Sequence, residues 1–194
     1  MQLHKRDVVD AATALLDEYG IADLTMRRLA RELDVSPGAL YWHFANKQQL
    51  LGAVADRILQ PACADVPTAA WRQRVEVIGA RLRDALLSHT DGAELVSASF
   101  AAGQSRAAVQ IVSRLADAAG AAGVAPEQAD LAARTLVYYV LGFTADEQSR
   151  LQWDAAGALA DEQSVLSADA GGRFGFGLRL LVHGIAAHRA EISR

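Results

Sequence analysis

The chain has 194 residues, 52% of them hydrophobic and 6% aromatic, with a formal net charge of −4. This length allows one small domain of about 60 residues beside one of ordinary size, and the acidic balance by itself argues against a nucleic-acid binder. The longest apolar run, residues 136–145, is well short of the ~18 residues that a membrane span needs, and the single cysteine, Cys63, excludes a disulfide within the chain. We therefore expect a cytoplasmic protein without a membrane partner.

The first predicted helix runs from about Lys5 to Tyr19. Its apolar residues repeat at helical spacing, and Gly20 is a suitable C-terminal stop. The side chains expected to point inward are those of Val8, Val9, Ala12, Leu15, Leu16 and Tyr19.

Residues 24–47 predict two short helices joined by a tight turn. Thr25 is placed to cap the first of them. Residues 34–35 break the helical pattern. Ser36 then caps the second helix, and Pro37 occupies its first helical position, where the missing N–H costs nothing.

The second of these helices has an unusual outward face. Leu40 and Phe44 are four positions apart and can face inward, which leaves small residues followed by aromatic ones on the outer side. This order suits a recognition helix pressed into the major groove of DNA, because a core helix of a bundle would hide its aromatic side chains. The outward residues are Gly38, Ala39, Tyr41, Trp42 and His43. Tyr41 and Trp42 could equally form a partly buried cap on a small head domain.

The local charge of the same segment also favours DNA. Residues 24–47 carry four basic residues against two acidic ones, a balance of +2 within an acidic chain. Attraction for phosphate must therefore be focused there. Arg27 and Arg28, at the start of the first helix of the pair, could instead be solvated side chains.

The rest of the chain also predicts helices. Asn46 can cap a fourth helix that continues to Leu59 and connects the head to the body. Residues 60–67, with prolines near both ends, form the best boundary, so we expect domains at 1–60 and 61–194. No alternating strand pattern appears, which predicts an all-α fold, and the course of residues 154–171 stays open. Further helices are predicted over residues 69–88, 93–101, 105–119, 126–151 and 173–191.

Four stretches carry a resemblance to a known family. They are AATALLDEYGIADLT (11–25), MRRLARELDVSPGALYWHFANKQQLLGAVADRIL (26–59), ALLSHTDGAEL (85–95) and FGFGLRLLVHG (174–184). Together they resemble the tetracycline repressor (TetR) family of transcriptional regulators, and the third stretch is similar to the effector domain of the family's founding members. The resemblance implies an all-α protein, in which a three-helix helix-turn-helix domain is joined by a fourth helix to a helical effector and dimerisation domain.

The resemblance also implies a function. We expect a repressor that binds double-stranded operator DNA of palindromic sequence as a homodimer, and that a small molecule releases. An arginine matching Arg27 reads a base edge in such proteins, while Tyr41, His43 and Lys47 suit phosphate contacts. The expected DNA-contacting residues are Thr25, Arg27, Arg28, Ser36, Pro37, Gly38, Ala39, Tyr41, Trp42, His43 and Lys47.

The dimer is expected on physical grounds as well, because one short recognition helix makes too few contacts and a twofold dimer doubles them. The long helix over 126–151 and the final helix are candidates for an isologous four-helix interface. The residues expected in that interface are Leu178, Leu181, Val182 and Ile185.

The effector site departs from the founding members, which bind a tetracycline–magnesium chelate. Val96 aligns with their metal-binding histidine and cannot coordinate a hard cation, whereas Asp146 keeps a carboxylate near the position of theirs. The resemblance therefore implies a largely hydrophobic effector, aromatic or polyketide-like, with no metal and no cofactor. The expected pocket is Ile78, Leu82, Val96, Phe100, Val109, Val112, Phe143, Asp146 and Trp153. These side chains could also simply fill a core, and the pair at 146–147 could be a hydrated surface pair.

Other functions remain open at this point. An activator, or a regulator without an effector, would have the same head. A helical enzyme or interaction module would need a polar catalytic cluster within residues 69–194, and the sequence offers none: the five histidines lack metal-ligand spacing. The glycine-rich stretch 172–177 follows no strand and is more typical of close helix packing, which we expect at a dimer seam. We therefore do not expect an enzyme.

Overall fold

The computed structural model describes residues 3–66, 70–158 and 170–192 of the chain. These residues are helical apart from turns and short loops, and the described part contains no strand, so the predicted all-α fold is confirmed. The elements are α1 (Lys5–Tyr19), α2 (Met26–Glu32), α3 (Pro37–Tyr41), α4 (Lys47–Leu59), the 3-10 helix η1 (Gln60–Cys63), α5 (Trp71–Leu87), α6 (Gly92–Ala101), α7 (Arg106–Ala121), α8 (Pro126–Ala155) and α9 (Ala170–Ile192).

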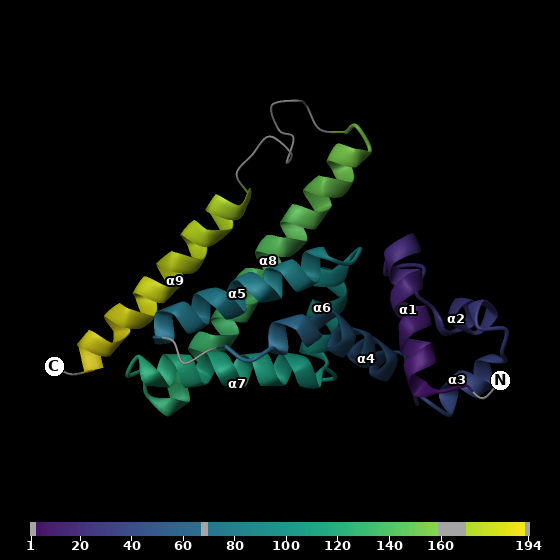
Figure 1. Ribbon diagram of the computed structural model, residues 1–194, viewed down its shortest axis with the longest axis horizontal. Helices are drawn as coiled ribbons and strands as arrows, with labels where there is room; N and C mark the ends of the chain where they lie inside the picture. The colour runs from purple at the N-terminus through teal and green to yellow at the C-terminus, as the bar shows by residue number, and fades with distance from the viewer. Residues whose placement is uncertain (1–2, 67–69, 159–169, 193–194) are drawn as a thin grey trace.

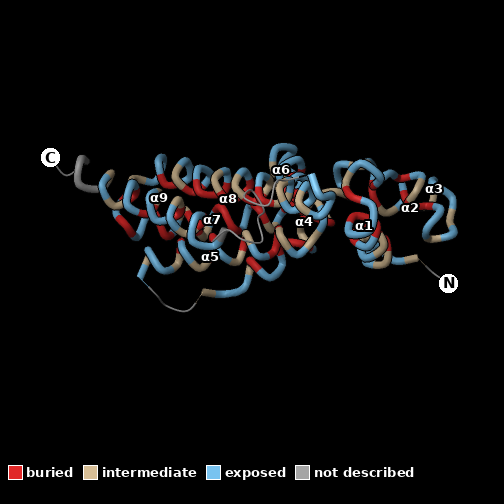
Figure 2. Tube along the Cα trace, turned by 90° about the horizontal axis from the view of Figure 1, so that it is seen from above, coloured by how far each residue is buried: buried red, intermediate tan, exposed pale blue. Residues whose placement is uncertain are grey.

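The molecule is elongated, with a small helical head at one end (Figure 1). Helices α1, α2 and α3 form this head, and α4 leads from it into a body built from α5 to α9. The long helices α8 and α9 run antiparallel, and their upper parts extend beyond α5. Buried positions continue from the head along α4 into the body (Figure 2).

Local capping explains why the head helices begin where they do. The Thr25 hydroxyl accepts the Arg28 N–H at 3.2 Å, the Ser36 hydroxyl accepts the Ala39 N–H at 3.3 Å, and the Asn46 side chain accepts the Gln49 N–H at 2.9 Å. All three caps were predicted and are confirmed. Gly20 ends α1 with φ of +77°, a conformation that glycine adopts without strain.

The head core forms from one face of each helix, and two of the residues predicted to point inward are not fully part of it. Leu16, Leu29 and Leu40 are fully buried, whereas Val9 is half-buried against the core. Tyr19, predicted to point inward, is 44% exposed. Its ring lies 3.7 Å from the Arg28 guanidinium carbon instead, because the last turn of α1 passes beside the start of α2.

The segment predicted as the domain boundary contains a further helical turn. Residues 60–63 continue α4 as a 3-10 helix, in which Ala62 is buried and the Cys63 thiol lies 3.7 Å from the Ala107 carbonyl. Burial raises the pKa of the Cys63 thiol, which makes this group a poor nucleophile. The division at residue 60 therefore falls inside a packed connection, and it stays a prediction.

The end of α8 and the start of α9 differ by a few residues from the predicted bounds. Helix α8 continues to Ala155, four residues beyond the predicted end, and α9 begins at Ala170, three residues before its predicted start. Gly157, with φ of +66°, closes the turn after α8, and residues 159–169 lie outside the described part. Within the described residues, no helix is both long and apolar enough to cross a bilayer.

Candidate DNA-binding and effector sites

Helix α3 carries two large aromatic side chains in solvent. Tyr41 is 51% exposed and Trp42, its C-cap, is 91% exposed, whereas Leu40 before them and Phe44 after them are buried. Because Leu40 and Phe44 anchor the segment inward, Tyr41 and Trp42 cannot turn into the same core. The alternative of a partly buried aromatic cap is therefore wrong for Trp42. A nearly bare indole is typical of an interaction surface.

The other predicted DNA-contacting residues surround this aromatic pair. Arg27, Pro37 and Gly38 are exposed, and His43 and Lys47 are half-buried. All of them come from α2, α3, the turn after α3 or the first turn of α4, at the end of the molecule opposite α9 (Figure 1). The structure thus brings the whole predicted set to one end of the head. The hydroxyls of the two capping residues accept backbone N–H groups, which leaves the hydrogen of each hydroxyl available as a donor.

The two arginines of α2 differ in their surroundings. Arg28 donates a hydrogen bond to Asp23 and lies over the ring of Tyr19, so its guanidinium is held inside the head. Arg27 is exposed and forms no ion pair with any described residue. Arg27 is therefore the side chain of the pair that is free to reach a base.

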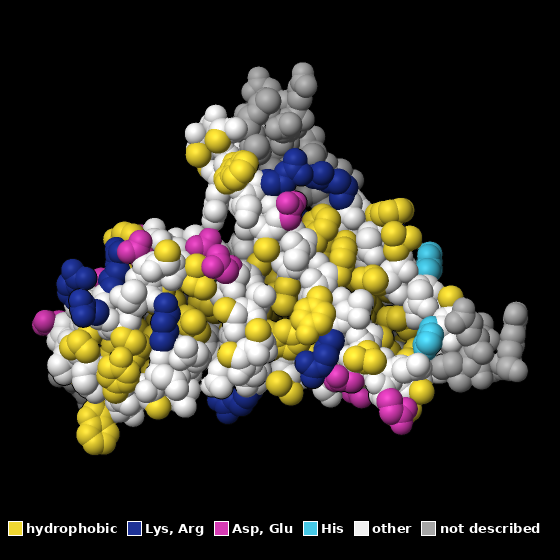
Figure 3. Space-filling model, turned by 180° about the vertical axis from the view of Figure 1, so that it is seen from behind, with side chains coloured by type: hydrophobic (Ala, Val, Ile, Leu, Met, Phe, Trp, Pro, Cys, Tyr) yellow, Lys and Arg dark blue, Asp and Glu magenta, His cyan; other side chains and the backbone are white. Residues whose placement is uncertain are grey.

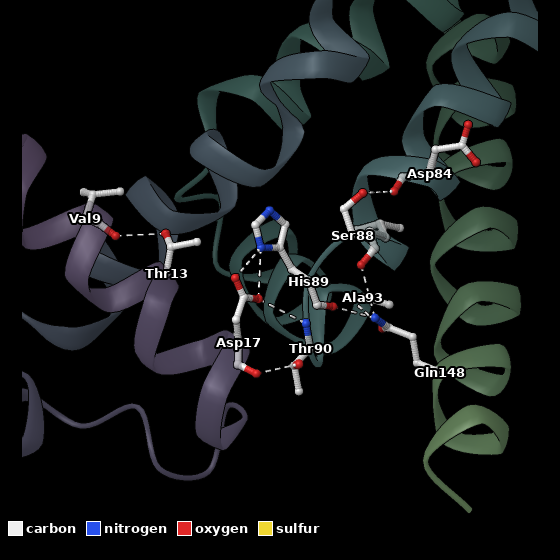
Figure 4. A network of polar contacts seen from close by, with 10 residues as sticks. Val9, Thr13, Asp17, Asp84, Ser88, His89, Thr90, Ala93 and Gln148 are labelled. Atoms are coloured by element: carbon white, nitrogen blue, oxygen red, sulfur yellow. Dashed lines mark hydrogen bonds and ion pairs between the residues drawn. The ribbon is translucent and has the colours of Figure 1, made fainter. Parts of the chain in front are cut away.

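The head is fastened to the body by the turn before α6 (Figure 4). The carboxylate of Asp17, in the last turn of α1, lies 3.0 Å from the His89 Nδ1 and accepts the Thr90 N–H at 3.2 Å. The Asp91 carboxylate accepts the Ile21 N–H at 2.9 Å. Gln148 of α8 holds the same turn, because it donates to the His89 carbonyl at 2.8 Å and accepts from the Ala93 N–H at 3.0 Å.

A second set of contacts between α4 and the body lies after α6, at the start of α7. Asp56 of α4 accepts the Ser105 hydroxyl at 2.8 Å and the Ala107 N–H at 2.9 Å. Gly52 of α4 lies directly against the backbone of Gln104, so that no side chain would fit there. The turn before α6 is thus attached to α1, whereas the turn after α6 and the start of α7 are attached to α4.

The predicted effector pocket is only partly assembled. Ile78, Leu82, Val96 and Val112 are at most 4% exposed in the body core, and Phe100 and Phe143 are half-buried. A cavity of about 190 Å³ is lined by Ile78 together with Asp65, Val66, Arg74 and Arg114, and no other predicted pocket residue lines it.

Three predicted pocket residues lie on the surface instead. Val109 is 62% exposed because α7 turns Ala108 and Val112 inward. Trp153 is 62% exposed near the end of α8, and Asp146 is exposed as well. The carboxylate that faces the core is that of Glu147.

Arg83 and Glu147 form a buried ion pair that sequence reasoning missed. The Arg83 Nε donates to one oxygen of Glu147 at 2.9 Å, the Nη2 donates to the other, and their side chains are only 15% and 8% exposed. The Arg83 guanidinium also lies 5.3 Å from the centre of the Phe174 ring. Helical spacing could have identified Glu147, since Val140, Thr144 and Glu147 repeat on one face of α8.

The residues predicted for the dimer interface are mostly covered within the single protomer. Leu178, Val182 and Ile185 are 2–8% exposed and Leu181 is half-buried, so they pack within the protomer and leave little surface for a partner. Large apolar side chains left exposed on α8 and α9 include those of Leu131, Tyr138, Phe176 and Leu180, besides Leu151 and Trp153 near the end of α8. A groove of about 410 Å³ between the two helices is lined partly by Leu131 and Leu180. Apolar side chains cover much of the molecular face in Figure 3.

The glycine-rich stretch packs within the protomer as well. Gly177 lies against the ring of Tyr139, whose hydroxyl donates to the Phe174 carbonyl at 2.7 Å. Close packing at Gly177 is therefore found between α8 and α9 of one protomer, and the role of the stretch at a dimer seam stays a prediction. Among the described residues, no group of three or more His, Cys, Asp and Glu side chains could hold a metal ion.

Comparisons with known proteins agree with this architecture. Residues 8–54 match the family described as bacterial regulatory proteins, tetR family, and residues 64–162 match the family described as tetracyclin repressor-like, C-terminal domain. The class E tetracycline repressor of Escherichia coli is 33% identical over 197 residues, which cover 95% of this chain and 92% of that protein.

Solved structures are similar over nearly the whole chain. Mycobacterium smegmatis BioQ is 66% identical with a TM-score of 0.90, over 96% of this chain and 99% of that one. BioQ with its natural double-stranded DNA operator is 62% identical with a TM-score of 0.85, over 96% and 100% of the two chains. A TetR variant from Acinetobacter baumannii AYE in complex with minocycline is 32% identical with a TM-score of 0.74, over 97% and 99%.

Proposed function

Because this chain belongs to the TetR family of bacterial DNA-binding regulators, we propose that it is a repressor that binds a palindromic operator as a homodimer. In this proposal a small, largely apolar effector releases the protein from its operator. Residues 1–60 serve as the DNA-binding domain and residues 61–194 as the effector and dimerisation domain.

The observation that carries the DNA-binding role is the exposure of Trp42 beside Tyr41 on a helix whose other face is anchored in the head. The large apolar indole surface would be covered in a complex, and the groove of a duplex offers thymine methyl groups and sugar edges for this contact. The solved BioQ complex with operator DNA, 62% identical to this chain, supports the same role.

Dimerisation is supported by the apolar side chains that remain exposed on α8 and α9. Leu131, Tyr138, Phe176 and Leu180 are each 55–63% exposed in the single protomer. These two antiparallel helices, paired with their copies, would bury that surface in a four-helix interface. A twofold dimer also sets the distance between two α3 helices, which must match successive major grooves.

Release follows from the contacts of the two turns that flank α6. A ligand that enters the body beside Val96 must displace α6, whose preceding turn is bonded to Asp17 of α1 and whose following turn, at Gln104, lies against Gly52 of α4. Displacement of α6 therefore changes the orientation of the head on the body. A ligand that favours the displaced arrangement lowers operator affinity by the difference between its affinities for the two arrangements.

The effector is expected to be apolar because the buried predicted pocket residues are aliphatic. Val96, Ile78 and Leu82 offer no metal ligand. The minocycline complex of a 32% identical TetR supports a small-molecule site in a body of this fold. The proposed ligand of this chain is not a metal chelate, because Val96 has no donor atom for a metal ion.

A gel-shift titration tests the proposal. The full-length protein is mixed with duplex DNA from upstream of its own gene and, separately, with a shuffled duplex of the same composition. We expect a specific complex of one dimer per palindrome. In vitro transcription from the same DNA should then be reduced by the protein, and increased transcription would identify an activator instead.

A further inference from the structure

Two buried hydroxyl groups of the body have no hydrogen-bond partner among the described residues. They belong to Ser99 of α6, which is 2% exposed, and Thr144 of α8, which is fully buried. Buried polar groups in native proteins nearly always have a partner, because leaving one unpaired costs free energy. An exception therefore needs an explanation.

The helical geometry does not prevent these hydroxyls from pairing. Elsewhere in the chain, helical hydroxyls donate to the carbonyl one turn earlier: Thr13 to Val9 at 2.9 Å, Ser88 to Asp84 at 2.7 Å and Thr135 to Leu131 at 2.8 Å. Thr135 and Thr144 are even on the same helix. Ser99 and Thr144 thus differ from the other helical hydroxyls in being both buried and unpaired.

Both residues lie in the segments where α6 runs antiparallel along α8. Ala93 is hydrogen-bonded to Gln148 at one end of this contact, and the rings of Phe100 and Tyr138 are 5.8 Å apart at the other end. Ser99 and Thr144 fall between these two points. They are also adjacent in sequence to Phe100 and Phe143, two residues of the predicted pocket.

The surrounding charge limits what could bind there. Glu147, one turn after Thr144, is already neutralised by Arg83, and both side chains are nearly buried. A charged ligand would have to lose its hydration without gaining a free counter-charge. An uncharged molecule avoids this cost.

We propose that Ser99 and Thr144 are the polar anchor of the effector site, and that the effector is an uncharged, mainly apolar molecule carrying a hydroxyl or carbonyl oxygen. This inference rests on the proposed effector function of the body. The oxygen pairs with the two hydroxyls, while Val96 and the neighbouring aromatic rings cover the apolar part. Since both hydroxyls are sealed from solvent, the ligand enters only when α6 and α8 separate.

The first test measures stability without any ligand. Ser99→Ala and Thr144→Val remove the unpaired oxygens with little change of volume. Each should raise the melting temperature of the full-length protein by about 2–4 °C, because an unsatisfied buried group is lost.

The matched controls are Ser97→Ala, exposed on the same helix, and Thr135→Val, which loses a formed hydrogen bond. Ser97→Ala should give a smaller rise, and Thr135→Val should give none. If both test variants melt at or below their controls, a trapped water or an internal partner satisfies the hydroxyls and the proposal is wrong.

The second test uses 2-naphthol and naphthalene as probes that differ by one hydroxyl. Calorimetry on the wild-type protein should give roughly 10-fold tighter binding of 2-naphthol. The Ser99→Ala/Thr144→Val double variant should bind both probes equally. Equal binding by the wild type, an unchanged preference in the double variant, or no binding of either probe would overturn the proposal.

Operator release is measured separately by gel shift. A probe that binds through these hydroxyls without releasing DNA leaves the anchor standing and contradicts the proposed repressor mechanism.

Discussion

Asp17 and His89, separated by 72 positions in the sequence, are in direct contact, with the His89 Nδ1 lying 3.0 Å from both carboxylate oxygens of Asp17. The same carboxylate also accepts the N–H of Thr90. A single side chain of the head therefore holds the turn that begins α6. This contact joins the part of the protein that carries the recognition helix to the part that is expected to sense a ligand.

Asp17→Ala should loosen this junction. Loss of two partly exposed hydrogen-bonded contacts should lower the free energy of unfolding by about 1–2 kcal/mol. It should also weaken the effect of any effector on operator affinity, because fewer contacts would pass a displacement of α6 to α1. Urea unfolding and gel shift measure the two effects. Glu18→Ala, the exposed neighbour, serves as the control, and equal behaviour of the two variants would argue against a coupling role for Asp17.

Arg27→Ala should weaken operator binding by ~1–3 kcal/mol and relax the preference at one base position. Lys47→Ala, in contrast, should weaken all sequences alike and reduce the salt slope by about one unit, as expected for a phosphate contact. Competition gel shifts with single-base operator variants distinguish the two. The base-reading role fails if Arg27→Ala loses as much affinity for random duplex as for the operator.

Trp42→Ala should reduce operator affinity while leaving the melting temperature within about 1 °C of the wild type. The reason is that the indole is 91% exposed and contributes almost nothing to the packing of the head. Leu40→Ala, two positions earlier and fully buried, provides the opposite control and should lower stability by ~2–5 kcal/mol. A clear loss of stability in Trp42→Ala would mean that the indole packs inside the head.

Leu180→Asp should dissociate the dimer without unfolding the protomer, because Leu180 is 55% exposed in the protomer and would be covered only by a partner. Leu178→Ala should instead lower the melting temperature, since Leu178 packs against Gly79 of α5 within the protomer. Analytical ultracentrifugation and thermal unfolding separate the two outcomes. A Leu180→Asp variant that remains dimeric would place the interface elsewhere.

Tetracycline should not release this protein from its operator, with or without magnesium. The position expected to bind the metal holds Val96, which is buried and has no donor atom. Gel shifts are titrated with the drug in magnesium and again in excess chelator. Release at micromolar drug that the chelator abolishes would contradict the metal-independent effector site.

The head could be predicted from sequence because its signals are local. Thr25, Ser36 and Asn46 each accept a hydrogen bond from an N–H three residues ahead, so the capping pattern is visible in any short window. The exposure of Trp42 could be inferred from Leu40 and Phe44 in the same way. The starts of α2, α3 and α4 follow from these signals.

The body was harder to predict because its helices are apolar on more than one side. In α9 both Leu178 and Leu180 are hydrophobic, and only the position of α5 decides which of them is buried within the protomer. On α8 helical spacing places Glu147 on the buried face, but its partner Arg83, 64 positions earlier, is known only from the packing of α5 against α8. Such choices depend on tertiary packing, which periodicity alone does not specify.

The contact between Gly52 and Gln104 has a mechanical consequence. A methyl group added at Gly52 would stand 2.8 Å from the Cβ of Gln104, so the two backbones already touch at the closest possible range. Because no flexible side chain separates the two backbones, a shift of the turn after α6 is transmitted directly to α4. A larger residue at Gly52 would force α4 and the turn at Gln104 apart and so change the junction between head and body.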